Sequence, residues 1–115
     1  GGTVPGDCLI GLTAEAIMKP CKRIEIVIEE PMAPRLVEVL RGLGVRGYTT
    51  VPNIGGEGDR GVRRADELAG DSSNTLFIIA CEDATLVGEL VEQVRPLLRR
   101  SGGICLVSDA QWLVH

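Results

Sequence analysis

The succession of hydrophobic patterns along the chain limits its fold more than any other feature of the sequence. Isoleucines alternate with other residues between Arg23 and Glu29, which is the period of two expected of a β-strand. Two prolines then open a segment, up to Gly44, in which leucine and valine residues follow the spacing of an amphipathic helix. The same strand-then-helix succession returns in the second half of the chain.

The remaining segments complete this pattern. We predict strands over residues 45–51, 75–82 and 104–108 from their apolar and β-branched content. Asp83 is a suitable N-cap for a second helix, which Pro96 should kink or end. The resulting order, β-α-β-β-α-β, is the ferredoxin-like arrangement of an α+β domain.

One domain accounts for the chain of 115 residues. We assign residues 1–21 to an N-terminal extension and residues 22–115 to the ferredoxin-like domain. In that topology the second and third strands form a hairpin, and the stretch 52–74 is its connecting loop. A loop this long in so small a domain is usually a binding loop or a disordered segment.

The third predicted strand is apolar on both of its faces. Leu76 and Ile78 lie on one side, and Phe77 and Ile79 lie on the other. Two helices cover only one face of a four-stranded sheet, so the second apolar face needs another partner. We therefore expect the chain to associate with copies of itself.

Charge and composition argue against several classes of function. The formal net charge of −4 disfavours general nucleic-acid binding, which requires a large basic surface. No apolar run is long enough to span a bilayer, and no basic residue precedes the apolar stretch 9–18, so we expect no membrane insertion and a cytoplasmic protein. The only histidine is His115, the last residue, and we expect neither a metal site nor a catalytic base from it.

The four cysteines form neither a zinc motif nor a redox pair. Cys81 and Cys105 lie in apolar runs and are expected to be small core residues. Cys8 and Cys21 flank the N-terminal segment, and the sequence leaves open whether they pair.

Glycines and arginines gather in the predicted loop. Gly56 and Gly58 allow the backbone to approach a ligand closely. Arg60, Arg63 and Arg64 carry guanidinium groups, which match phosphate oxygens in bidentate fashion. The spacing fits neither a P-loop nor a dinucleotide-binding fingerprint. The composition therefore favours a site for phosphate or another small anion.

The motifs around this loop resemble those of the PII signalling family. The similar residues are a strand ending in Gly47-Tyr48-Thr49, the run Gly55-Gly56-Glu57-Gly58-Asp59-Arg60, and then Arg63. The sequence is most similar to the PII-like branch associated with carboxysomes and inorganic carbon.

This resemblance implies a homotrimeric signalling protein that is not an enzyme. It would bind ADP or AMP, and bicarbonate, in clefts between subunits, and it would need no cofactor. The long loop corresponds to the family's T-loop, which relays the ligand state to a protein partner. A carboxysome component or a bicarbonate transporter is the kind of partner that the resemblance implies.

The resemblance also implies which residues contact the ligands. The nucleotide-binding set, carried over by position, is Gly47, Tyr48, Thr49, Gly56, Gly58, Arg60, Arg63, Ser101, Gly102, Gly103 and Ile104. The set implied for bicarbonate or another anion is Arg60, Arg63 and Arg99. No catalytic residue and no metal ligand is expected.

The chain departs from the ammonium-signalling members of the family in two places. Its only tyrosine is Tyr48, at the end of a strand, whereas theirs include a modifiable tyrosine in the T-loop. The turn between Arg99 and Gly103 lacks their Gly-Asp-Gly-Lys run. Both differences argue against nucleotidyl modification and 2-oxoglutarate sensing.

Two other functions remain open from the residues alone. A ferredoxin-like domain can hydrolyse small phosphate esters, with Arg60 holding the phosphate and Asn53 or Asn74 orienting water. A metal-responsive trimer of the cation-tolerance type has the same broad shape but lacks the glycine–arginine loop. A turnover assay tests the first alternative, and metal-dependent protection from thermal unfolding tests the second.

We predict that Arg60→Ala weakens nucleotide binding by about 1.5–3 kcal/mol, the range for a hydrogen bond to a charged group. Titration calorimetry with ADP measures the loss. Arg64→Ala is the matched control, because we expect that side chain to lie in solvent or to contact a protein partner, and not to bind the nucleotide. A loss of no more than a few tenths of a kcal/mol for Arg60→Ala would remove Arg60 from the site.

Overall fold

The computed structural model describes residues 17–55 and 73–115. Their elements follow the predicted β-α-β-β-α-β order, with one short 3-10 turn added before the first helix. In chain order they are β1 (Met18–Glu29), η1 (Glu30–Met32), α2 (Ala33–Gly42), β2 (Thr49–Ile54), β3 (Asn74–Cys81), α4 (Ala84–Ser101) and β4 (Ile104–Leu113).

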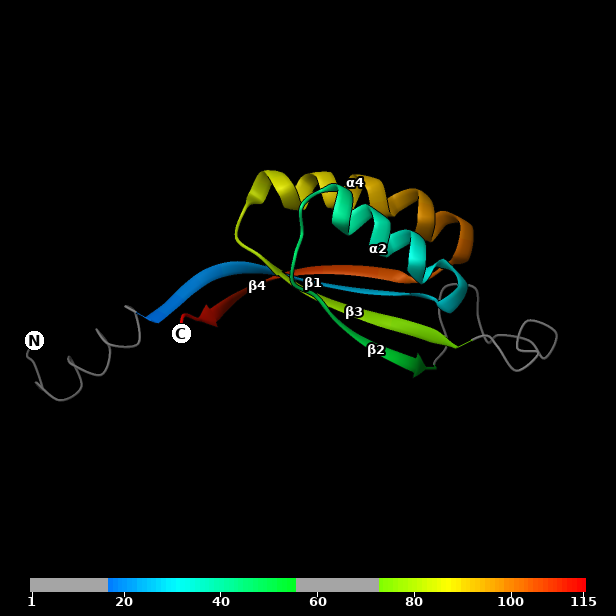
Figure 1. The fold of residues 1–115 in the computed structure, drawn as a ribbon, viewed down its shortest axis with the longest axis horizontal. Coiled ribbons are helices and arrows are strands. Elements are labelled where there is room, and N and C mark those ends of the chain that lie inside the picture. Colours follow the sequence, from blue (N-terminus) through cyan, green and yellow to red (C-terminus); the bar gives the residue numbers. More distant parts are fainter. Residues whose placement is uncertain (1–16, 56–72) are drawn as a thin grey trace, which may run out of the picture.

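The four strands form one antiparallel sheet in the order β2-β3-β1-β4. β2 and β3 pair as the predicted hairpin, and β2 and β4 are the two outer strands. Both helices lie on the same face of the sheet, which leaves the other face without helices (Figure 1). The fold is therefore the α+β, ferredoxin-like fold expected from the sequence.

The core lies between the sheet and the two helices. Its centre is the helix-facing side of β1, where Ile24, Ile26 and Ile28 are completely buried. Burial of each such side chain contributes about 1.5–3 kcal/mol to folding. The other fully buried large side chains come from both helices and from β3: Leu36, Leu40, Phe77, Ile79, Leu90 and Val94.

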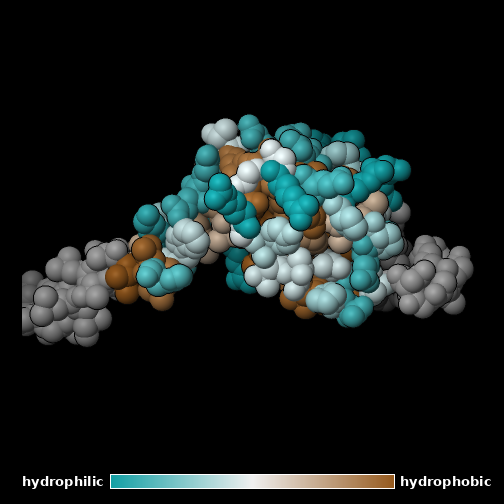
Figure 2. Space-filling model, viewed as in Figure 1, coloured by the Kyte–Doolittle hydropathy of each residue, from teal (hydrophilic) through white to brown (hydrophobic). Residues whose placement is uncertain are grey.

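The face of the sheet away from the helices carries an apolar row that crosses all four strands. Figure 2 shows apolar side chains at the lower margin of the molecule, on the side away from the helices. Residues paired in register lie on the same face, so Val51, Leu76, Val27 and Ile104 form one continuous line. Its outer members Val51 and Ile104 are 39% and 41% exposed, and Leu106 in the next row is 53% exposed. The prediction that the third strand is apolar on both faces is confirmed.

β1 and β4 are longer than the sequence indicates. They pair continuously from Met18 opposite Leu113 to Val27 opposite Ile104, whereas alternation had placed the strands at 23–29 and 104–108. The outer half of this two-stranded ribbon extends past the helices (Figure 1). No helix covers this outer part. Its strands therefore pair without the alternating hydrophobic pattern that a buried face requires.

β2 begins later than predicted, at Thr49 instead of residue 45. Val45 belongs to the connection after α2 and packs against the core there, so its apolar character reflects packing rather than strand pairing. The strand ends in an irregular step between Val51 and Ile54, where Asn53 has a φ of 60°. Pro52 fits because β2 is an outer strand of the sheet.

α4 begins as the sequence predicts. The Asp83 carboxylate accepts hydrogen bonds from the backbone N–H groups of Thr85, at 2.9 Å, and Leu86, at 3.3 Å. Of the two alternatives expected for Pro96, a kink or an end of the helix, the second is wrong, because α4 continues to Ser101. Pro96 and Glu92 are exposed, so water can hydrate the carbonyl that a proline cannot pair. Neither helix combines the length and apolarity needed to cross a membrane, within the part of the chain that the structure describes.

No disulfide joins the three cysteines that the structure describes, Cys21, Cys81 and Cys105. Cys81 is a core residue, as predicted, and Cys105 is only partly buried. Burial raises the pKa of the Cys105 thiol, because the charged thiolate is poorly solvated there. Cys8 lies outside the described residues, so its pairing with Cys21 stays untested.

At Gly103, the chain that follows α4 passes close to the end of β1. The φ of Gly103 is 117°, and a Cβ atom there would lie 2.2 Å from the backbone oxygen of Val27. We predict that Gly103→Ala lowers the free energy of unfolding by about 2–3 kcal/mol or more, from clash and backbone strain together. Urea denaturation at a fixed protein concentration measures the change.

Gly44→Ala is the matched control for this substitution. Gly44 also has a positive φ, of 82°, but no atom lies within 4 Å of the position that its Cβ would take. Gly44→Ala should lower the free energy of unfolding by only about 1 kcal/mol, the cost of a left-handed backbone conformation. Equal losses for the two variants would show that the contact with Val27 is unimportant.

Candidate functional site

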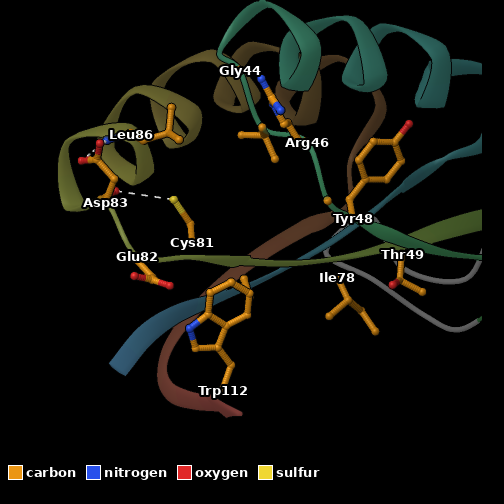
Figure 3. Close-up of a pocket in the computed structure, with 13 residues that line it drawn as sticks. Gly44, Arg46, Tyr48, Thr49, Ile78, Cys81, Glu82, Asp83, Leu86 and Trp112 are labelled. Atoms are coloured by element: carbon orange, nitrogen blue, oxygen red, sulfur yellow. Dashed lines mark hydrogen bonds between the residues drawn. The ribbon is translucent and has the colours of Figure 1, made fainter. Parts of the chain in front are cut away.

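A pocket of about 770 Å³ lies where β2 begins and β3 ends (Figure 3). Its wall is formed by the α2–β2 connection from Gly44 to Tyr48, by Thr49, and by the end of β3 with the loop into α4. Leu86 of α4 and Trp112 of β4 complete it. Three of the residues implied for nucleotide binding, Gly47, Tyr48 and Thr49, thus line one pocket.

The end of α2 fixes the course of this connection. Gly44 donates to the carbonyl of Arg41 at 3.1 Å, and Val45 donates to that of Leu40 at 2.9 Å. With Gly44 in the left-handed region, this is the Schellman arrangement that ends many helices. The turn directs Arg46 and Gly47 to the mouth of the pocket.

Tyr48 and Thr49 point to opposite sides of the sheet (Figure 3). The Tyr48 ring packs on Phe77, with ring centroids 5.7 Å apart and planes inclined by 36°. Thr49 pairs with Ile78 and therefore lies on the face without helices. Tyr48 is held by core packing, while Thr49 is exposed and lines the pocket.

The opposite wall of the pocket carries two carboxylates. Asp83 is occupied in capping α4, and the carbonyl of the same residue accepts a hydrogen bond from Cys81 Sγ at 3.6 Å. Glu82 is exposed and completes the acidic wall. Arg46 is the basic residue of the pocket.

The turn between α4 and β4 contains four further implied nucleotide contacts. The Ser101 hydroxyl is buried and lies 3.2 Å from the Leu97 carbonyl and 2.8 Å from that of Gly102. Gly102 ends the helix with a φ of 76° and donates to Leu98 at 2.7 Å. Ile104 is the exposed member of the group. The serine hydroxyl is therefore already hydrogen-bonded to backbone carbonyls. A ligand at this turn could contact the backbone near Gly103 and the side chain of Ile104.

One copy of the chain does not bring these two groups together. Thr49 lies on β2 and Ile104 on β4, which are opposite edges of the sheet. Three strand spacings of about 4.8 Å separate such edges, or roughly 14 Å. The implied nucleotide-binding residues therefore form two half-sites in one subunit.

The loop residues of the implied site, Gly56, Gly58, Arg60 and Arg63, lie outside the described residues. The base of that loop is described, and Asn74 Nδ2 donates across it to the Ile54 carbonyl at 3.5 Å. Asn74 pairs with Glu29, so the loop leaves the sheet at the same end as the α4–β4 turn. Arg99, in the last turn of α4, is at this end too.

Sequence reasoning found only Gly47, Tyr48 and Thr49 of the pocket wall and missed the others, among them Arg46, Glu82 and Trp112. No local motif marks them, and Trp112 is separated from Thr49 by most of the second half of the chain. Only the register of β4 on β1 places its indole there. Within the described ranges, no group of three histidine, cysteine, aspartate or glutamate side chains could hold a metal ion.

Comparison with known proteins connects this geometry to a family. The family model of nitrogen regulatory protein P-II matches residues 21–114. CPII, a nitrogen regulatory PII-like protein from Thiomonas intermedia K12, is similar in structure when bound to ADP, AMP and bicarbonate: it is 29% identical, with a TM-score of 0.70 over 83% of this chain and 97% of that chain.

Two further solved structures are similar. CPII of the same organism bound to ADP and bicarbonate is 30% identical, with a TM-score of 0.70 over 83% of this chain and 90% of that chain. A PII-like signaling protein from Thermus thermophilus is 24% identical, with a TM-score of 0.67 over 84% of this chain and 93% of that chain, a likeness that supports the fold alone.

Proposed function

This chain belongs to the nitrogen regulatory protein P-II family, and from that membership we propose that it is a sensor of adenine nucleotides and bicarbonate. ADP or AMP binds in clefts between the subunits of a homotrimer. The long loop between β2 and β3 reports the bound ligand to a protein partner in inorganic carbon metabolism, and the protein acts in the cytoplasm without catalysing a reaction.

The observation that supports this proposal most is the similarity to CPII, which binds ADP, AMP and bicarbonate in its solved structures. The similarity extends over most of both chains, and the family model spans residues 21–114, a range that includes the pocket and the α4–β4 turn. A family name alone would leave the ligand open, because the fold by itself does not determine what is bound.

The two half-sites support a binding cleft between copies of the chain. The β2 edge carries Gly47 and Thr49, and the β4 edge carries Gly103 and Ile104. When two copies associate so that the β2 edge of one approaches the β4 edge of the next, the halves meet in one cleft. Repeating the same head-to-tail contact closes a ring, as heterologous interfaces do when the rotation permits.

The uncovered apolar face of the sheet supports the same assembly. Its central row, Val51–Leu76–Val27–Ile104, is an extended apolar surface of the kind that monomers seldom leave in water. Three such faces turned towards a common axis would bury one another. The trimer therefore shelters this surface and completes the binding clefts at the same time.

Arginine side chains are proposed to bind the anionic parts of the ligands. Arg60 and Arg63 of the loop are proposed to bind the phosphates, and bicarbonate binds beside them with Arg99 at the same end of the sheet. These arginines reach an anion only when the loop folds over it, so the ligand stabilises one shape of the loop. The partner, a carboxysome component or a bicarbonate transporter, recognises that shape.

Calorimetric titration tests this function directly. AMP, ADP, ATP and cyclic AMP are each titrated with and without bicarbonate, and we expect micromolar binding of ADP or AMP that bicarbonate tightens. Absence of binding by every nucleotide would overturn the proposal. Steady phosphate release, linear in protein concentration, would instead favour the phosphate-ester hydrolase.

Thr49 and Thr50 form a matched pair for testing the pocket. Both are exposed threonines of β2, but Thr49 faces the pocket and Thr50, paired with Phe77, lies on the other face of the sheet. We predict that Thr49→Arg fills the pocket and weakens ADP binding at least about tenfold, or roughly 1.4 kcal/mol. Thr50→Arg should leave the affinity unchanged, and equal effects of the two would exclude the pocket.

Leu106 tests the assembly. Its side chain lies on the uncovered face beside the apolar row, so Leu106→Asp would bury an unpaired carboxylate between subunits, which costs several kcal/mol. We predict monomers by size-exclusion chromatography with light scattering. Gln93→Asp, on the exposed surface of α4, is the control and should keep the native mass. A trimer that persists in Leu106→Asp would place the interface elsewhere.

A further inference from the structure

Trp112 is the only tryptophan of the chain, and its indole is exposed at the wall of the pocket. The residue lies near the end of β4, where it pairs with Lys19 and is 44% exposed. No core contact explains it, since the buried core consists of aliphatic side chains, cysteine and Phe77. Large aromatic side chains left in water at a pocket are common places for ligand contact.

The strand register puts the indole on the same face as the implied base contacts. Thr49, Ile78 and Trp112 all belong to the face of the sheet without helices. Ala80 belongs to the same face and also lines the pocket. Its methyl side chain is exposed and small, so it leaves space beside the indole. Figure 3 shows Thr49, Ile78 and Trp112 on one side of β3, with Tyr48 and Leu86 on the other.

The pairing of β2 with β3 leaves room for a planar ligand at this place. The ladder between the two strands ends at Thr49 and Ile78, and Gly47 continues the chain without entering the strand. The outer edge of β3 beyond Ile78 therefore faces the pocket. A flat ring that entered from this edge would come within reach of the indole of Trp112, which lines the same pocket.

The charges of the pocket decide which part of a nucleotide fits here. Glu82 follows Ala80 on the same face, and Asp83 adds a second carboxylate to this wall. Their negative charge repels phosphate but not an uncharged purine. An uncharged base therefore fits beside Trp112 and these carboxylates better than a phosphate would, because the basic residue of the pocket, Arg46, belongs to the other wall.

We propose that the indole of Trp112 is the surface on which the base of the bound adenine nucleotide stacks. This inference rests on the proposed function and adds to it a residue that the sequence comparison did not indicate. Stacking on an aromatic ring is available to any base, so Trp112 supplies affinity, and selection of adenine falls to other groups in the pocket.

The single tryptophan allows a test on the unmodified protein. ADP is titrated while tryptophan emission and its quenching by acrylamide are followed, in parallel with calorimetry on the same sample. We expect saturable loss of acrylamide quenching at the calorimetric midpoint. Inorganic pyrophosphate, which has charge but no base, should leave the quenching unchanged.

Two variants separate stacking from an indirect change. Trp112→Ala should weaken ADP binding about tenfold, within the range for removal of an aromatic ring from a base, and Trp112→Phe should restore most of the affinity. Leu113→Ala is the matched control, because Leu113 is the next residue of β4, is 54% exposed and faces the other side of the sheet. It should bind ADP as the parent does.

The outcomes distinguish this inference from the proposed function. If calorimetry detects ADP binding while acrylamide quenching and the affinity of Trp112→Ala stay unchanged, the stacking proposal is wrong and the function stands. If quenching is already low in the nucleotide-free trimer and ADP does not alter it, Trp112 is covered by a second copy of the chain and the proposal fails as well. If no nucleotide binds, both fail.

Discussion

The backbone pairing of β1 on both of its sides is the interaction on which the rest of the structure depends. β1 is bonded to β3 along one edge and to β4 along the other, so it fixes both of these strands directly and β2 through β3. Its helix-facing side supplies Ile24, Ile26 and Ile28, the buried row against which both helices pack. A slip of β1 by one residue in its register with β3 would turn these isoleucines towards the uncovered face.

The same register arranges the functional surfaces. It aligns Val27 with Leu76 and Ile104, which makes the uncovered face apolar across its full width. It also carries the C-terminal part of β4 past the helices, so that Trp112 reaches the pocket at the beginning of β2. Assembly and ligand binding are thereby linked, because the surface that needs a partner lies between the two half-sites that a partner would join.

The candidate site could be predicted from the sequence only in part. Gly47, Thr49 and the α4–β4 turn were found because they belong to short motifs that can be matched locally, and the structure places them on two edges of one sheet. Ser101 was matched by position as well, but its hydroxyl is engaged by the carbonyls of Leu97 and Gly102. Glu82 and Trp112 belong to no motif, and only the twist and register of the sheet bring them into the pocket.

The sequence by itself determined the order of the elements, the buried face of β1 and the cap of α4, because alternation and capping are local properties of neighbouring residues. It also indicated the second apolar face of β3. Only the tertiary structure decided where β1 and β4 end, since their outer pairs, such as Met18 with Leu113, are held by backbone pairing that depends little on the type of side chain. The division of the site into two half-sites likewise follows from the strand order, which places β2 and β4 at opposite edges of the sheet. The sequence motifs identify residues at each edge but do not show that the edges lie apart.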